Sequence, residues 1–150
     1  MSILDKINED IKKAMLAKEK EKLEALRAVK AAFLLAKTEN SAKENLSYEK
    51  ELQIIQKLIK QRKDAAEIYK QQNRMDLFEP EEFQAEIISS YLPAQLSAEE
   101  LNLEISKIIE QTGASTIKDM GKVMGIANSK LVGKADSKSI SAIVKQLLTK

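Results

Sequence analysis

The sequence contains neither cysteine nor histidine in its 150 residues. Without cysteine the chain has no disulfide, no thiolate zinc site and no cysteine nucleophile. Without histidine it lacks the side chain that most often acts as a general base and as a metal ligand. These absences argue against most catalytic designs, and we predict no catalytic residue, no metal site and no cofactor.

Long apolar runs are absent as well. The longest, residues 31–36, is far too short to span a bilayer. Asp5 and Lys6 follow only two apolar residues at the N-terminus, so no signal peptide is indicated. With 43% apolar and 32% charged residues the chain can still bury a core. The sequence therefore predicts a soluble protein of the cytoplasm with no membrane partner.

Glycine, proline and aromatic residues are few and unevenly placed. All four glycines lie after residue 112, and all six aromatic residues precede residue 94. A long stretch without glycine that is rich in Leu, Ala, Glu and Lys favours helices. The composition changes at Pro93, which disfavours a helical Leu92. We predict an N-terminal helical domain over residues 1–93 and a C-terminal module over residues 94–150.

Apolar side chains recur with the period of an α-helix, and no long stretch alternates with period two. The pattern predicts an all-α fold, with about four helices in the N-terminal part and three in the C-terminal module. Met15 and Ile68 fall within apolar stripes that we expect to be buried. In the first part we predict that the first helix is capped by Ser2 and that the second ends near Lys37, before a loop over 38–46. The third helix is predicted to be capped by Ser47 and to end at Asn73–Arg74. The fourth is predicted to run from the cap Asp76 to Tyr91, with Pro80 in its first turn.

The three helices of the C-terminal module follow Ser97, Thr116 and Asp136. Ser97 and Glu100 have the spacing of a capping box, in which each side chain bonds the other residue's backbone N–H. Gly113 suits the left-handed residue that ends a helix.

Three local motifs permit a chemical or a structural interpretation, and in each the structural one is favoured. Glu82 and Glu86 form a carboxylate pair, but acids also favour helix N-termini. The motif of residues 121–125, GKVMG, lacks the spacing and the Lys-Ser/Thr ending of a phosphate loop, so we expect its two glycines to let another backbone pack closely. Tyr69 and Tyr91 are expected to be core residues with a solvated hydroxyl group.

The formal net charge is only +2, but positive charge is concentrated in one part of the chain. From Gln111 onward seven lysines stand against two aspartates, a net charge of +5. Clustered lysines can neutralise a phosphate backbone, although a solvated lysine face would have the same pattern. Aromatic residues are missing there, so base stacking is not available. The candidate RNA-binding residues are Lys118, Lys122, Lys130, Lys134, Lys138 and Lys145, with Arg27, Arg62 and Arg74 added from the first part.

Several segments together resemble the YqeY family. They are residues 86–101, EIISSYLPAQLSAEEL, the motif GKVMG at 121–125, Ala135–Asp136 with the Val144–Lys145 helix, Leu26–Arg27, and residues 74–77. The resemblance implies a two-part helical fold. It also implies a relation to the C-terminal tail of the GatB subunit of tRNA-dependent amidotransferases, a tRNA-recognition appendage whose enzyme carries its catalytic chemistry elsewhere.

The resemblance therefore implies a non-catalytic module that binds tRNA or another structured RNA, with no DNA ligand. An aminoacyl-tRNA amidotransferase or synthetase is the protein partner that we expect. Two alternatives remain open. The chain is a carbon–nitrogen ligase with glutamine as amido-N-donor, or a subunit of one, since the family commonly carries that label; or it is a helical protein–protein adaptor.

Overall fold

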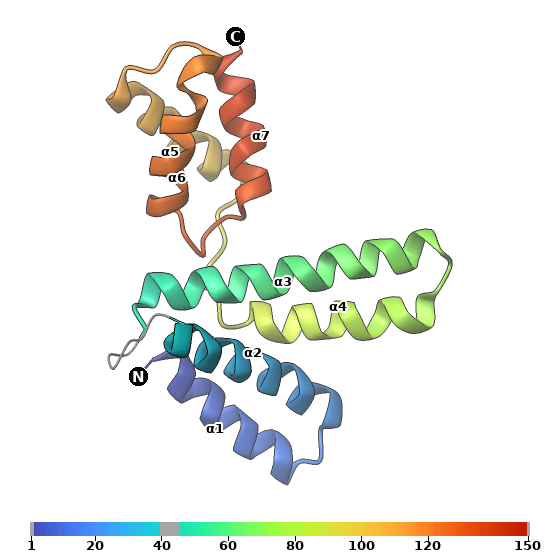
Figure 1. Ribbon diagram of the computed structural model, residues 1–150. Helices are drawn as coiled ribbons and strands as arrows, with labels where there is room; N and C mark the ends of the chain where they lie inside the picture. Colours follow the sequence, from blue (N-terminus) through green and yellow to red (C-terminus); the bar gives the residue numbers. More distant parts are fainter. Residues whose placement is uncertain (1, 40–45, 150) are drawn as a thin grey trace. The chain divides into compact units, whose positions relative to one another are not determined.

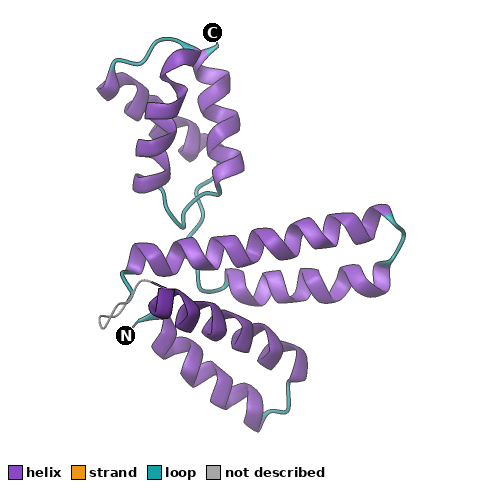
Figure 2. Cartoon of the chain, in the orientation of Figure 1, coloured by secondary structure: helices purple, strands orange, loops and turns teal. Residues whose placement is uncertain are grey.

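The computed structural model describes residues 2–39 and 46–149. Every regular element in this part of the chain is helical, which confirms the all-α class (Figure 2). The chain divides into two units, residues 1–92 and 93–150. In chain order the elements in Figure 1 are α1 (Ile3–Leu16), α2 (Lys20–Glu39), α3 (Tyr48–Gln71), α4 (Met75–Ser89), α5 (Ala98–Thr112), the 3₁₀ helix η1 (Ile117–Asp119), α6 (Met120–Lys130) and α7 (Ser137–Leu148).

The first unit consists of two helix pairs, α1 with α2 and α3 with α4, and α2 also packs against α4. Its largest fully buried side chains lie on helices that pack together, and those on the same helix are three or four residues apart. They are Ile7, Leu26, Val29, Phe33, Ile55 and Ile88. Met15 and Ile68, predicted to be buried, are each 53% exposed. The prediction was wrong because the inward positions in those turns belong to Ala14 and Ala66, both buried.

The caps at Ser2 and Ser47 are confirmed. The Ser2 hydroxyl accepts the Asp5 N–H, and the Ser47 hydroxyl accepts the Lys50 N–H. Helix α2 continues to Glu39, past its predicted end, because no glycine or proline stops it. The rest of the loop predicted over 38–46 lies outside the described residues, apart from Leu46.

Helix α4 begins earlier than the sequence predicts. Asn73 has a left-handed φ of 57°, which reverses the chain after α3 and makes Arg74 the N-cap residue. Asp76, the predicted cap, lies inside the helix instead, and its carboxylate accepts two hydrogen bonds from the Arg74 guanidinium group, at 3.0 and 2.9 Å. Pro80 therefore lies within the helix rather than in its first turn, at the cost of a backbone hydrogen bond. The helix ends at Ser89, before the predicted Tyr91.

The second unit packs α5, α6 and α7 around one apolar core. The buried members include Leu101, Ile105, Val123, Ala127, Ile140 and Val144. The capping box of Ser97 and Glu100 is confirmed, with both bonds at 3.1 Å. Gly113 is also confirmed as the left-handed stop of α5, with φ 70°. Among the described residues, no helix is long and apolar enough to cross a membrane.

The segment before α5 is fastened to the turn between α6 and α7. The Gln95 side-chain amide donates to the carbonyls of Pro93 and Gly133, at 2.9 and 2.7 Å. The Leu96 N–H donates to the Lys134 carbonyl at 3.0 Å. Gly133, with φ 77°, supplies the left-handed residue of this turn. These bonds hold the backbone that carries the Lys134 side chain.

Candidate nucleic-acid interface

The six predicted lysines all lie on the helical hairpin made by η1, α6 and α7. Lys118 lies in η1, Lys122 and Lys130 in α6, Lys134 in the turn that follows, and Lys138 and Lys145 in α7. All six are exposed. We call them the hairpin lysines.

Apolar packing within the second unit determines where these lysines lie. Helices α6 and α7 run side by side, and the far end of α7 also contacts η1 (Figure 1). Lys145, in the last turn of α7, is therefore at the same end of the hairpin as Lys118, whereas Lys130 and Lys138 flank the turn at the other end. Lys138 and Lys145 are seven residues apart, close to two full turns, and so project from one side of α7.

The hairpin lysines are not held in ion pairs within the described part of the chain. None of the six forms an ion pair with a residue that the structure describes. Lys130 Nζ donates a hydrogen bond to an amide oxygen, Gln111 Oε1, at 3.4 Å. The nearby Asp119 carboxylate accepts the N–H groups of Ser115 and Thr116, at 3.0 and 3.3 Å, and these bonds lower its pKa. The charge of Lys122 also lowers the pKa of Asp119, so the hairpin carries an excess of positive charge in which no lysine forms a close ion pair with a described residue.

The two glycines of the GKVMG motif do not pack against another backbone, so that prediction was wrong. Gly121 and Gly125 are exposed, and a Cβ added at either would meet no atom within 4 Å. The buried face of α6 is formed by Val123 and Ala127 instead. Gly121 and Gly125 are each two residues from a buried position, roughly 200° around the helix axis. They leave the α6 backbone open beside Lys122.

The three candidate arginines lie in the first unit, in different surroundings. Arg27 is exposed on α2. Arg62 bridges α3 and α4, because its guanidinium group donates to Gln84 Oε1 at 3.0 Å and to the Leu58 carbonyl at 3.2 Å. Arg74 is held by both oxygens of Asp76. The structure brings no two of them to one helix.

A groove on α4 is a surface feature that sequence reasoning missed. It lies between α3 and α4 and combines the side chains of Phe78 and Phe83 with several glutamates. The available signal was the composition of α4, which has five acidic residues and no basic residue. Among the described residues no three acidic side chains are grouped as a metal site would require.

Fold and surface together define a class: a small all-helical protein with exposed lysines gathered on one helical hairpin. Comparison with known proteins specifies it further. The family model described as Yqey-like protein matches residues 4–148. The chain therefore belongs to the YqeY family, which confirms the resemblance found in its sequence.

Two relatives, both named Altered inheritance of mitochondria protein 41, mitochondrial, are similar to the chain. The protein from Lachancea thermotolerans is 31% identical over an alignment of 152 positions, and the alignment covers 96% of this chain and 80% of the relative. The protein from Clavispora lusitaniae is 28% identical over 116 residues, which cover 76% of this chain and 66% of the relative.

Proposed function

We propose that this protein is a non-catalytic RNA-binding module whose hairpin lysines contact the phosphate backbone of a structured RNA, with tRNA as the expected ligand. The observation that carries the proposal is the set of six exposed lysines that form no ion pair with a described residue. Ammonium groups in this state can exchange counterions for phosphates without first breaking an ion pair. The resemblance to the tRNA-recognition tail of GatB supports the same ligand class.

Recognition by this surface depends on the shape of the RNA and on its backbone. Residues 94–150 contain no aromatic side chain, so the hairpin has no platform on which a base can stack. Contacts to phosphates and 2′-hydroxyl groups of a folded RNA remain, which is why we expect tRNA in preference to DNA. The open backbone of Gly121 and Gly125 lets an RNA strand lie close to α6 beside Lys122.

The proposed protein partner is an aminoacyl-tRNA amidotransferase or a synthetase, because a tRNA-binding module without its own chemistry serves an enzyme that acts on the same tRNA. We retain the prediction of a cytoplasmic location for this chain. The word mitochondrial in the names of the two relatives describes those proteins.

The test is filter binding of total tRNA over a series from about 50 to 200 mM salt. If most of the hairpin lysines contact phosphates, the plot of log affinity against log salt has a slope of roughly −3 to −5. Substitution of Lys122, Lys138 and Lys145 by Gln weakens binding and makes the slope shallower by about 2 to 3. The matched control replaces Lys12, Lys57 and Lys70 of the first unit by Gln, which removes the same charge.

Three results would contradict the proposal: no binding at low salt, a flat salt dependence, or an equal loss in the control variant. A separate assay addresses the ligase alternative. Purified protein that amidates Glu-tRNA or Asp-tRNA from glutamine without another enzyme would show a catalytic protein instead.

A further inference from the structure

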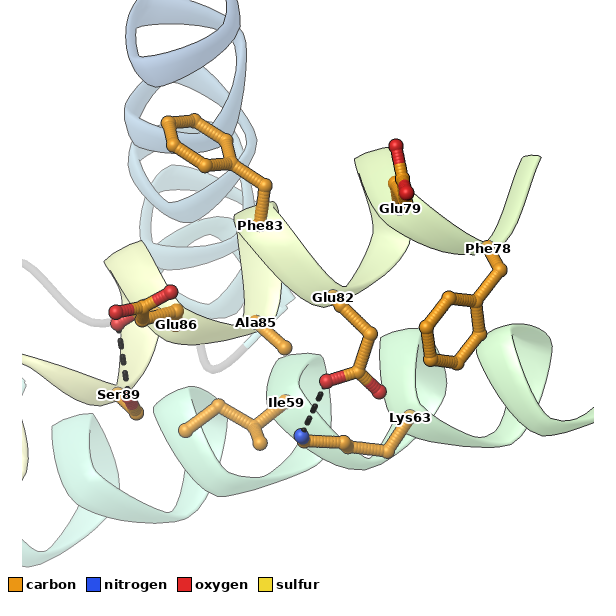
Figure 3. A pocket seen from close by; sticks show the side chains of 9 residues that line it. All are labelled: Ile59, Lys63, Phe78, Glu79, Glu82, Phe83, Ala85, Glu86 and Ser89. Atoms are coloured by element: carbon orange, nitrogen blue, oxygen red, sulfur yellow. Dashed lines mark hydrogen bonds and ion pairs between the residues drawn. The ribbon is translucent and has the colours of Figure 1, made fainter. Parts of the chain in front are cut away.

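A groove of about 460 Å³ runs along the first unit where α4 packs on α3. Figure 3 shows Phe78 directed toward α3, with Ile59 and Ala85 nearby on the floor, whereas Phe83 and Glu79 point away from α3. Phe83 is 37% exposed, and Met75 at the start of the same helix is 48% exposed. Among the groove's lining residues Phe83 is thus the large apolar side chain that stands exposed, and Met75 is exposed on the same helix outside the lining.

The charge around the groove is mainly negative, although Lys63 of α3 is also among its lining residues. Helix α4 carries five acidic residues and no basic one. Glu82 is engaged by Lys63 of α3, with Nζ and Oε2 2.8 Å apart. Glu79 and Glu86 form no ion pair with a described residue. They are seven residues apart, so they lie on one side of α4 and are separated by about 10 Å along its axis.

We propose that the α3–α4 groove binds a basic amphipathic helix from a partner protein. A groove that combines apolar and charged side chains in this way accepts an amphipathic helix, whose apolar anchors recur three, four and seven residues apart. Lysines or arginines beside those anchors would meet Glu79 and Glu86. The acidic groove repels nucleic acid, so this site takes a ligand opposite in charge to the one proposed for the hairpin lysines.

The lysine-bearing helices α6 and α7 of a second copy are poor occupants, because they carry no exposed large apolar anchor among the described residues. In the described part of the second unit, the large hydrophobic residues that stand exposed are Leu103 and Ile117. Neither lies on α6 or α7. A partner helix that combines apolar anchors with positive charge fits both features of the groove.

The absence of cysteine makes a site-specific test simple. The variant S89C places one thiol on the groove, and S90C places one on the next residue, outside the groove lining. Each is labelled with an environment-sensitive fluorophore and titrated with a synthetic peptide of about 18 leucines and lysines in amphipathic helical order. We expect a saturable change in the S89C label, no comparable change in the S90C label, and weak binding of a scrambled peptide of the same composition.

Substitutions in the groove supply the second readout. Combining Glu79→Gln with Glu86→Gln raises the peptide dissociation constant about tenfold, because two partly exposed charge contacts are lost. Phe83→Ser weakens binding similarly by removing an apolar anchor. The matched control, Glu99→Gln with Glu110→Gln on α5, leaves the affinity unchanged. Circular dichroism verifies that each variant is folded.

Several outcomes would overturn the inference. They are equal binding of the scrambled peptide, an unchanged affinity in the Glu79 and Glu86 variant, and an equal loss in the α5 control. Sedimentation that reveals a dimer abolished by Phe83→Ser would assign the groove to a second copy. A response of the S89C label to tRNA would assign it to nucleic acid. None of these outcomes depends on whether the hairpin lysines bind RNA.

Discussion

The hydroxyl group of Tyr91 donates a hydrogen bond to the carboxylate of Asp10, 81 residues away in the sequence. The bond ties the chain just beyond α4 to helix α1. Burial raises the pKa of Tyr91, and the bond to Asp10 raises it further, so the phenol remains a neutral donor at physiological pH. The sequence predicted a solvated hydroxyl group here, and the structure corrects that prediction.

Tyr91→Phe tests this bond. The substitution leaves a partly buried Asp10 carboxylate without its donor, and we expect the free energy of unfolding to fall by about 1 to 2 kcal/mol. All three tyrosines lie in the first unit, so tyrosine fluorescence in a urea titration follows that unit alone. Tyr48→Phe, at an exposed position, is the control and leaves stability unchanged. Equal stability of the two variants would show that the Tyr91 bond contributes nothing.

Glu51 supplies a prediction about pH. It is only 5% exposed, accepts the Leu4 N–H at the start of α1 at 3.4 Å, and has a pKa raised by burial. A carboxyl group whose folded pKa exceeds its unfolded value stabilises the fold below the unfolded value, about 4.5, and loses that contribution as pH rises through the folded pKa. Glu51→Gln removes the charge and keeps the acceptor.

We therefore expect Glu51→Gln to stabilise the first unit by roughly 1 kcal/mol at neutral pH. The difference from the unmodified protein disappears as the pH is lowered to the unfolded pKa. Urea titrations at several pH values measure it, with the exposed Glu49→Gln as control. A Gln variant that is less stable at neutral pH would mean that the carboxylate stabilises the α1 N-terminus by more than its burial costs.

Alanine substitutions at the glycines of the second unit are expected to change stability in opposite directions. Gly113→Ala forces a side chain into a left-handed conformation and is expected to cost about 1 kcal/mol. Gly121→Ala and Gly125→Ala add a better helix former where there is open space, and each is expected to stabilise by about 0.5 to 1 kcal/mol. Amide hydrogen exchange of residues 98–148 in the full chain measures both effects. Destabilisation by Gly121→Ala would show that the α6 backbone is closely packed after all.

Variants of Arg62 and Arg27 are expected to differ, because Arg62 has a structural role and Arg27 is a candidate for RNA binding. Arg62→Gln breaks the contact with Gln84 and is expected to lower the stability of the first unit by about 1 kcal/mol. Arg27→Gln, at an exposed position, leaves stability unchanged and weakens tRNA binding about two- to threefold, as the loss of one surface charge contact does. Urea titration and filter binding distinguish the two. Unchanged tRNA affinity in the Arg27 variant would remove Arg27 from the proposed interface.

The sequence could predict those features of the candidate site that depend only on where residues lie along a single helix. Once α6 and α7 are placed, Lys138 and Lys145 must share a side of α7. The groove on α4 was missed because its lining comes from two helices, with Ile59 and Lys63 on α3 and Phe78 and Phe83 on α4. The start of α4 was misjudged because Asn73 adopts a left-handed conformation that admits an earlier helix and leaves Asp76 to pair with Arg74.

By itself the sequence determined the helical class, the Ser97–Glu100 capping box and the stop at Gly113. Each of these depends on residues within one helical turn, whose hydrogen bonds and φ angles follow from their side chains. Only the tertiary structure decided that Tyr91 meets Asp10, that Glu51 accepts an N–H of α1, and that Gly121 faces outward. Those outcomes depend on which helix covers which face, and the helical period of a single segment does not specify its neighbours.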